Sequence, residues 1–424
     1  MVSCRSMGAD THRTIDALWR IESPRLIGGL TRLVRDLDLA EELAQDALVT
    51  ALEQWPRTGI PDNPGAWLMT TARNRAFDRL RRERMLARHH EALGHELEME
   101  QREGDGRLED SVDDPIGDDL LRLIFVACHP LLSTEARTAL TLKLVGGLTT
   151  AEIARAFLQP EATIAQRIVR AKRTLSDARA PFEIPRGAAL AERLSSVLEV
   201  TYLIFNEGYA ATAGGDWMRP ALCEEALRIG RILATLTPEE AEVHGLVALM
   251  EIQASRLRAR SGTDGEPVLL MDQNRALWDR LLIGRGLASL QRAEALTSTR
   301  GFYLLQAAIA ACHARAVSVA ETDWERITAL YAELARLTPS PVIELNRAVA
   351  VAMAHGPAAG LALADRLAAG GALENYHLLP SVRGDLLVRL GRHAEARAEF
   401  ERAAKLTHNE RERRLLLDRA DRSR

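Results

Sequence analysis

The chain has 424 residues, of which 47% are hydrophobic, and its formal net charge at neutral pH is −4. This length allows two or three domains of roughly 100–200 residues each, and the hydrophobic fraction is sufficient for packed cores. The small net charge excludes recognition of nucleic acid by overall charge, so such a function would depend on local basic patches.

The sequence indicates neither membrane insertion nor secretion. It contains no run of about 18 apolar residues, so we expect no transmembrane helix, and its first residues lack the apolar core of a signal peptide. The four cysteines are far apart and form no CxxC pair. Cys128-His129 lacks the further ligands that a metal site needs, so we expect buried thiols, no metal and no cofactor, in a reducing cytoplasm.

The fold is predicted to be all-α. Residues that favour helices are abundant, and the period-two alternation of half-buried strands is nearly absent. Shifts in charge and the placement of proline and glycine suggest a division of the chain into segments. These are a helical bundle at 10–90, an acidic flexible linker at 91–119, a helix-turn-helix domain at 120–182 and a helical-repeat domain at 187–424.

The first informative helix covers residues 36–55, DLDLAEELAQDALVTALEQW. Its hydrophobic positions recur at helical spacing and predict a buried stripe. An acidic patch on its other side consists of Glu41, Glu42, Gln45 and Asp46. Such a patch suits a basic partner surface. A loop rich in proline and glycine is expected between Trp55 and Pro64.

The next helix is strongly basic, because residues 73–90 contain seven arginines against Asp78 and Glu83. A solvated helix face is the ordinary interpretation, but one so one-sided in charge is unusual. Arginine can neutralise phosphates, and asparagine can hydrogen-bond to a base edge. The candidates for contact with DNA are Arg73, Asn74, Asp78, Arg81 and Arg82. In residues 91–119 the balance reverses to twelve acids against two arginines, which predicts the flexible linker.

Residues 146–175, GGLTTAEIARAFLQPEATIAQRIVRAKRTL, predict a helix-turn-helix. Thr149 and Thr150 stand where an N-cap belongs, and Pro160 ends the first helix. The second helix has an apolar stripe of Ile164, Ile168, Ala171 and Leu175. Its exposed polar and basic positions include Thr163, Gln166, Arg167, Arg170 and Arg173. This arrangement is typical of major-groove readers, although an ordinary helical hairpin shares the pattern.

The residues from 187 onward indicate stacked helix pairs. Leu-Thr-Pro at 236–238 recurs at 337–339, and Leu-Thr-His follows at 406–408, at intervals near three times and twice 34. A period of 34 is the tetratricopeptide spacing. The clearest pair is predicted at 376–390 and 394–406. Such repeats bury a shared core and expose a concave surface.

Two other segments of this half have alternative interpretations. The aromatic-rich residues 202–209 either form a core helix or pack the repeats against the preceding domain. The polar residues 264–280 could imitate a catalytic or metal site, but a loop that caps a helix at 275–282 is the better interpretation.

The two N-terminal motifs together resemble a known family. AEELAQDAL followed by PGAWLMTTARNRAFDRLRR resembles region 2 of bacterial sigma factors of the sigma-70 superfamily, and LTTAEIARAFLQPEATIAQRIVRAKRTL resembles region 4. Only the acidic linker joins them, which is similar to the extracytoplasmic-function (group IV) sigma factors. The resemblance covers roughly residues 10–180. The turn that usually holds a glycine is Leu158-Gln159-Pro160 here, so the start of the reading helix is less well defined.

The resemblance implies a promoter-specificity subunit that is not an enzyme. The acidic patch would dock on the β′ clamp helices of core RNA polymerase, with a further contact to the β flap. The basic helix would engage the −10 element of promoter DNA, where a flipped base is read. The five polar residues of the second helix would read the −35 element. Trp67 and Phe77 could stack on a base or pack in the core, and the linker could mimic nucleic acid or act as a tether.

The resemblance also implies a role for the C-terminal extension, since sigma factors with such an extension form a subgroup in which it is implicated in control. The extension could bind a small DGPF/YCII-like protein or the chain's own sigma domains. We hypothesise regulation in cis, because tethering gives a millimolar effective concentration.

Two other functions are weighed against this one. A freestanding helix-turn-helix regulator with a tetratricopeptide-like sensory domain would not need the acidic or the basic helix, and such regulators usually dimerise on palindromes. An enzyme in the C-terminal half would need a phosphate loop, a nucleophile elbow or metal-ligand spacing, and the sequence shows none of these.

Overall fold

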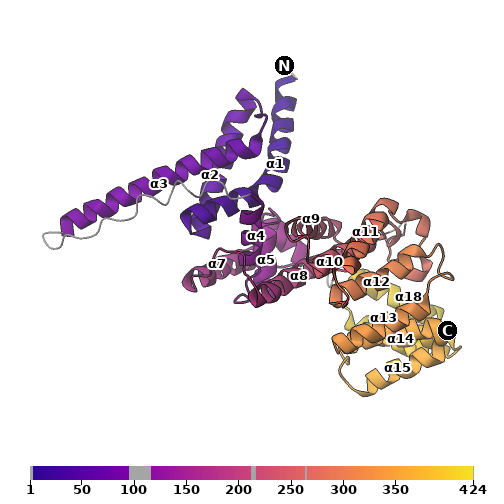
Figure 1. Ribbon diagram of the computed structural model, residues 1–424. Coiled ribbons are helices and arrows are strands. Elements are labelled where there is room, and N and C mark those ends of the chain that lie inside the picture. The colour runs from indigo at the N-terminus through magenta and orange to yellow at the C-terminus, as the bar shows by residue number, and fades with distance from the viewer. Residues whose placement is uncertain (1–2, 95–115, 212–215, 263–264, 424) are drawn as a thin grey trace. The chain divides into compact units, whose positions relative to one another are not determined.

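The computed structural model describes residues 3–94, 116–211, 216–262 and 265–423 (Figure 1). They form two compact units, Met1–Val200 and Thr201–Arg424, each of which is described by itself. The all-α prediction is confirmed, because the described residues form helices and no strand apart from an isolated bridge between Ser261 and Pro267. No helix in these ranges is long and apolar enough to span a membrane.

The first three helices of unit 1 are α1 (Ser3–Val34), α2 (Leu37–Thr58) and α3 (Pro64–Gly94), and they pack against one another (Figure 1). Asp36 caps α2 by accepting a hydrogen bond from the backbone N–H of Leu39 at 2.8 Å. The prediction of a loop from Trp55 is wrong. Pro56 lies inside the last turn of α2, and although its missing N–H removes one intrahelical hydrogen bond, α2 continues to Thr58.

The acidic linker predicted at 91–119 falls mainly on residues 95–115, which lie outside the described residues. Its last four residues begin α4 (Ile116–Ala127). Asp119 in this helix is only 5% exposed, and its carboxylate lies 3.1 Å from Arg32 Nε and 2.7 Å from Arg122 Nη1. This end of the acidic segment is therefore part of a packed helix.

The predicted helix-turn-helix consists of α6 (Thr150–Phe157) and α7 (Glu161–Asp177), packed on α5 (Thr134–Leu144). Thr149 is the N-cap and forms a capping box with Glu152: the Glu152 N–H donates to Thr149 Oγ1 at 3.2 Å, and the Thr149 N–H donates to Glu152 Oε2 at 2.8 Å. The predicted apolar stripe of α7 is buried, at Ile164, Ile168, Ala171 and Leu175.

Leu158 occupies the position in the turn where the resembling family usually has glycine. Its φ of 51° and ψ of 41° are left-handed, and its side chain is exposed. A side chain in this conformation costs roughly 1–2 kcal/mol. Leu158 thus adopts a left-handed conformation without being glycine, so the turn stores strain.

Replacing Leu158 with glycine is expected to raise the free energy of unfolding of unit 1 by about 0.5–1 kcal/mol, because the relief of strain exceeds the entropy that glycine adds to the unfolded chain. Chemical denaturation followed by circular dichroism measures this change. Gly147, which already has a φ of +67°, provides the reverse control. Gly147→Ala should destabilise the unit, and a destabilised Leu158→Gly variant would contradict the strain.

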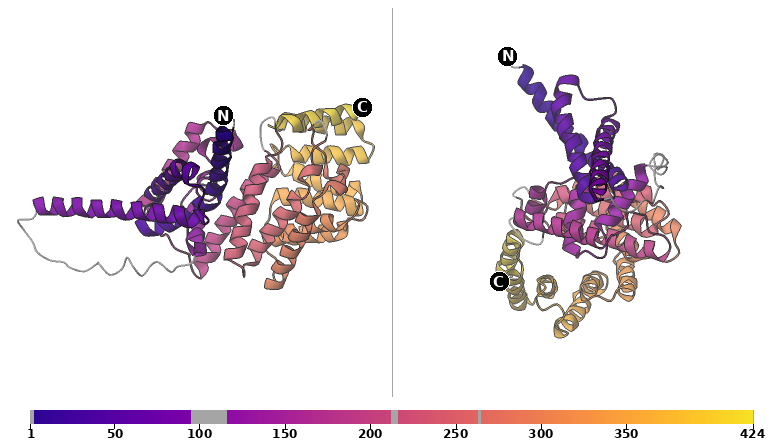
Figure 2. Two further views of the ribbon diagram at one scale, coloured as in Figure 1. Left: turned by 90° about the horizontal axis from the view of Figure 1, so that it is seen from above. Right: turned by 90° about the vertical axis from the view of Figure 1, so that its left-hand side faces the viewer.

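Unit 2 begins within α8 (Ala188–Tyr209) and continues as helices that contact their neighbours in chain order (Figure 2). The predicted core interpretation of residues 202–209 holds for Ile204 and Phe205, which are fully buried. The remaining helices are α9 (Pro220–Leu236), α10 (Ala241–Ala254), α11 (Arg280–Leu296), α12 (Phe302–Arg315), α13 (Trp324–Leu337), α14 (Pro341–His355), α15 (Pro357–Ala369), α16 (Leu378–Arg389), α17 (His393–Leu406) and α18 (Glu410–Arg422).

The recurring Leu-Thr pairs mark helix ends, because α9, α13 and α17 each end at the leucine and are capped by the threonine. The period of 34 is wrong for the first interval. It contains two helix pairs and an irregular segment, residues 255–279, with the short 3-10 helices η1 (Leu257–Ala259), η2 (Leu270–Asp272) and η3 (Arg275–Leu277). The second interval contains two helix pairs without such an insertion, so its spacing is close to the tetratricopeptide value.

The helix expected at 275–282 is also corrected. Asp279 accepts hydrogen bonds from the N–H groups of Leu281 and Leu282, and so it caps α11, which begins at Arg280. Arg275 lies before this cap, in η3, and is buried.

The two ends of unit 2 meet, so it differs from an open solenoid with two free ends. Asn409, at the start of α18, is 2% exposed and donates to the carbonyl oxygens of Ala211 and Asp216 at 3.2 and 3.1 Å. Arg414 lies 2.7 Å from Glu266. The last helix therefore packs on the loops that follow α8 and α10, and its capping asparagine also fixes this closure.

Candidate nucleic-acid interface and partner-docking helix

The acidic patch predicted on α2 is partly covered. Glu41 is only 8% exposed, and its carboxylate lies 2.6 Å from Lys172 Nζ of α7 and 3.5 Å from Lys143 Nζ of α5. Lys172 also lies 2.7 Å from Asp38. We call Lys172, Glu41 and Asp38 the α2–α7 clasp. The expectation that Glu41 belongs to an exposed patch is therefore corrected, because the helix-turn-helix domain packs over it.

The clasp is favourable electrostatically. Burial alone lowers the pKa of Lys172, but the neighbouring carboxylates of Glu41 and Asp38 outweigh it, and the pKa is raised. Lys172 is therefore charged at neutral pH and pairs with carboxylates from a helix more than a hundred residues away in the sequence.

The other residues of the patch, Glu42, Gln45 and Asp46, are exposed. Glu42 lies 2.9 Å from Arg79 Nη1, and Asp46 lies 3.1 Å from Arg75 Nη1. Both pairs are about half exposed, and such surface pairs contribute about 0–1 kcal/mol. A basic partner could therefore replace either arginine at little cost.

The DNA candidates of α3 lie on its accessible surface. Asn74, Asp78, Arg81 and Arg82 are exposed, and Arg73 is half-buried with its guanidinium 5.9 Å from the centre of the Phe77 ring. Asp78 and Arg82, together with Arg75, Arg79, Leu43 and Asp46, line a groove of about 500 Å³ between α2 and α3. Two of the five DNA candidates, Asp78 and Arg82, thus share one groove with Asp46 of the acidic patch.

The aromatic residues near this helix contribute to the core. Trp55 is 2% exposed and makes an edge contact with Trp67, with ring centres 5.3 Å apart. Trp55 is therefore not placed to stack on a base. Trp67 and Phe77 are half-buried, so each keeps some accessible surface.

The residues of α7 predicted to read DNA face away from the clasp. Thr163, Gln166 and Arg170 are exposed, and together with half-buried Arg167 they line a groove of about 350 Å³ beside residues 131–133. Arg173 is exposed and lies 3.5 Å from Asp177, and it is not among the residues that line this groove. The structure therefore brings four of the five candidates together.

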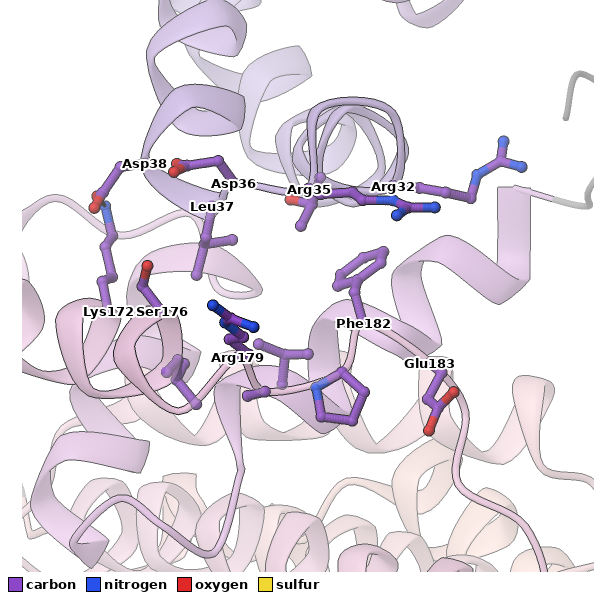
Figure 3. A pocket seen from close by; sticks show the side chains of 15 residues that line it. Arg32, Arg35, Asp36, Leu37, Asp38, Lys172, Ser176, Arg179, Phe182 and Glu183 are labelled. Carbon is purple, nitrogen blue, oxygen red and sulfur yellow. Dashed lines mark hydrogen bonds and ion pairs between the residues drawn. The ribbon is translucent and has the colours of Figure 1, made fainter. Parts of the chain in front are cut away.

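A further cavity of about 760 Å³ lies beside the clasp, where the α1–α2 junction meets the segment after α7 (Figure 3). Its lining includes Arg32, Arg35, Arg179 and Phe182. Arg35 and Arg179 have left-handed backbones, with φ of 54° and 48°. Sequence reasoning missed this cavity, because its walls come from residues about 140 positions apart that show no local motif.

Cys128 lies buried, as expected. Its Sγ is 3.2 Å from Thr141 Oγ1, and burial raises the pKa of the thiol to about 11 despite that hydrogen bond and nearby arginines. The thiol is therefore protonated at neutral pH and takes a structural position. Within the described ranges, His, Cys, Asp and Glu form no group of three or more that could hold a metal ion.

Comparisons with known proteins match three parts of the chain to protein families. Residues 18–85 match the family Sigma-70 region 2, residues 122–175 match Sigma-70, region 4, and residues 193–294 match a family of unknown function, DUF6596. The region 2 match covers α2 and most of α3, and the region 4 match covers the helix-turn-helix.

Individual proteins are also similar to the chain. An uncharacterized protein of Rhizobium meliloti (strain 1021) is 46% identical over 388 residues, which cover 91% of this chain and 90% of that protein. The ECF RNA polymerase sigma factor SigK of Mycobacterium sp. (strain KMS) is 31% identical over 159 residues, 36% of this chain and 76% of the relative. SigK of Mycobacterium sp. (strain JLS) matches with the same identity and coverage.

Proposed function

The chain belongs to the sigma-70 superfamily, in the extracytoplasmic-function group of RNA polymerase sigma factors, and from this premise we propose that it binds core RNA polymerase and directs transcription from promoters with defined −10 and −35 elements. The observation that carries this proposal is the pairing of an acidic helix with two separate basic helix faces in one compact unit. The activity is assembly and recognition rather than chemistry.

We propose that the polymerase contact is made by the acidic face of α2, on the β′ clamp helices, with region 4 contacting the β flap. Glu42 and Asp46 are accessible for this contact in the arrangement described, whereas Glu41 is not. Use of Glu41 would require α7 to move away and release it from Lys172. Core binding and opening of the α2–α7 clasp would then be linked.

We propose that α3 engages the −10 element through Arg73, Asn74, Asp78, Arg81 and Arg82. The arginines would neutralise phosphates, and Asn74 would hydrogen-bond to a base edge. For the −35 element, Thr163, Gln166, Arg167 and Arg170 line one groove and would read bases, while Arg173 would contact the backbone. The DGPF/YCII-like partner is not part of the proposal, because the comparisons lend it no support.

In vitro transcription with core RNA polymerase on a genomic fragment library, with and without the protein, tests the proposal. New discrete start sites that share two upstream elements are the expected result. Polymerase that ignores the protein, while the protein alone binds DNA tightly, would instead identify a freestanding regulator.

Arg170→Ala is expected to lower transcription from such a promoter by about 5- to 150-fold, the equivalent of 1–3 kcal/mol for a lost bidentate base contact. Arg155→Ala, at an exposed arginine of α6 outside the groove, is the matched control and should retain activity. An Arg170→Ala protein that still depends fully on the −35 sequence would remove this residue from the reading surface.

We further propose that unit 2 modulates the sigma domains in cis. The deletion that tests this should end at Val200 rather than near Pro185, because the first half of α8 packs on unit 1. Ser196 Oγ donates to the carbonyl of Cys128 at 2.6 Å, and Arg193 donates to the carbonyl of Phe125 at 2.7 Å. Unchanged promoter-specific transcription from residues 1–200 would rule out a modulating role.

A further inference from the structure

Two buried arginines of unit 2 have no acidic partner among the residues that the structure describes. Arg256, which follows α10, is 9% exposed, and Arg275, in η3, is 8% exposed. Among the described residues, no carboxylate lies within ion-pair distance of either guanidinium. Buried charges are normally paired, because transfer of an unpaired ion out of water is very unfavourable. This pair of cations therefore needs an explanation.

Arg275 is partly satisfied by the end of a helix. Its Nη1 donates to the carbonyl oxygens of His313 and Ala316, at 2.9 and 2.7 Å, and its Nη2 donates to Thr322 Oγ1 at 3.1 Å. These carbonyls belong to the C-terminal end of α12, which carries a partial negative charge. The contacts hold the guanidinium in place but supply no full negative charge.

Arg256 is held by aromatic rings. Its Cζ lies 5.7 Å from the ring centres of both Tyr209 and Trp278, and the Cζ of Arg275 lies 5.0 Å from the same Trp278 ring. The two cations therefore gather around one indole. Cation–π contacts are stabilising, but they satisfy no N–H donor.

Four nitrogen atoms of this cluster are buried and lack a hydrogen-bond partner within the described part of the chain: Arg256 Nε, Arg275 Nε, Trp278 Nε1 and His313 Nδ1. The two guanidinium nitrogens and the indole nitrogen can only donate, and the imidazole nitrogen donates in one tautomer. A buried donor that is left without an acceptor destabilises the fold. A group of donors beside two positive charges calls for an acceptor that is also negative.

Other charged and titratable groups near the cluster do not fill this role. The pKa of Arg275 is lowered, chiefly by burial and then by the repulsion of Arg256. Glu321, in the segment after α12, opposes this shift but has the smallest effect of the three. The pKa of the half-buried Tyr331 on α13 is raised to about 12, chiefly by desolvation, so this residue is neutral at physiological pH. The missing negative charge is not supplied by these neighbours.

We propose that the cluster of Arg256, Arg275, Trp278 and His313 binds a small anion, either an inorganic ion or the carboxylate of a small acid. The anion would accept hydrogen bonds from the orphaned N–H groups and neutralise the two guanidinium ions. The site lies in the C-terminal unit and three of its four residues fall within the DUF6596 match. It would give the extension a ligand of its own.

Isothermal titration calorimetry on the full chain, in a buffer with a bulky counter-ion, tests the site with chloride, formate and inorganic phosphate in separate arms. Saturable binding of at least one of these ions at one site per chain is expected. The ion that binds most tightly identifies the class of ligand as a halide, a carboxylate or a phosphate. Trp278→Phe keeps an aromatic ring but removes the N–H donor. It should weaken binding by at least about 10-fold, the effect of a hydrogen bond to a charged group.

Arg256→Gln should abolish binding, whereas Arg258→Gln, at an exposed arginine two residues away, should leave it unchanged. If Arg256→Gln fails to fold by circular dichroism, Trp278→Phe decides the question. The proposal is overturned if no ion saturates the wild-type chain, as when ordered water fills the site, or if both variants bind as the wild type does. The assay contains no polymerase, so its outcome is independent of the proposed sigma function.

Discussion

Replacing Lys172 with methionine is expected to lower the free energy of unfolding of unit 1 by about 2–4 kcal/mol at pH 7. Methionine retains most of the apolar stem but leaves Glu41, 8% exposed, without its closest cation. Breaking a buried ion pair on one side typically costs about 3–5 kcal/mol. The loss is smaller here because Lys143 still lies 3.5 Å from Glu41. Urea denaturation followed by circular dichroism measures the change.

The adjacent residue provides a matched control with the opposite expectation. The side chain of Arg173 is 81% exposed and its partner Asp177 is 71% exposed, so Arg173→Met should change stability by less than about 1 kcal/mol. Transcription should show the opposite order. Arg173→Met should lower transcription more than Lys172→Met does, because Arg173 is a proposed −35 contact. Equal stability of the two variants would show that the clasp does not hold the helix-turn-helix against α2.

The stability of unit 2 is expected to fall below pH 6.5 because of His313. Burial, together with Arg256 and Arg275, lowers the pKa of this imidazole to about 3. The unfolded chain takes up the proton near pH 6.5, whereas the folded chain does not until about pH 3. The contribution of His313 is therefore complete above pH 6.5 and is lost progressively as the pH falls toward 3. At pH 4.5 the loss of unfolding free energy amounts to about 3 kcal/mol.

His313→Phe isolates this effect, since phenylalanine can keep the edge contact with Trp324, whose ring centre lies 5.1 Å away, but cannot titrate. Between pH 7 and pH 4.5 the variant should lose about 3 kcal/mol less unfolding free energy than the wild type. The same substitution at exposed His393 is the control and should leave the wild-type pH dependence unchanged. A His313→Phe protein with that same dependence would show that the imidazole is not buried in a neutral form.

One helix thus serves two surfaces. In α7, Lys172 points toward α2, while Arg167 and Arg170 line a groove on another face. Because 3.6 residues make one turn, neighbouring residues face different directions. The cations of such a helix are therefore not all candidates for DNA contact. Lys172 instead forms ion pairs with α2 inside the protein.

The sequence by itself determined the helical fold class, the helix-turn-helix and the family. These features depend on local signals: the Thr149 to Glu152 capping box, the break at Pro160 and the spacing of Ile164 and Ile168. Local signals act within one or two helical turns, so they can be read from consecutive residues. The polar faces of α3 and α7 were also visible in this way.

The tertiary structure alone decided which of those polar residues are free. The burial of Glu41 depends on Lys172, 131 residues later, and the closure of unit 2 depends on Asn409 meeting Ala211, 198 residues earlier. The cluster of Arg256 and Arg275 likewise takes its orphaned donors from the segments around η1 and η3 and from α12. Pairing over such distances depends on how whole helices pack. The charge pattern along one helix therefore does not predict which residue of another helix it pairs with.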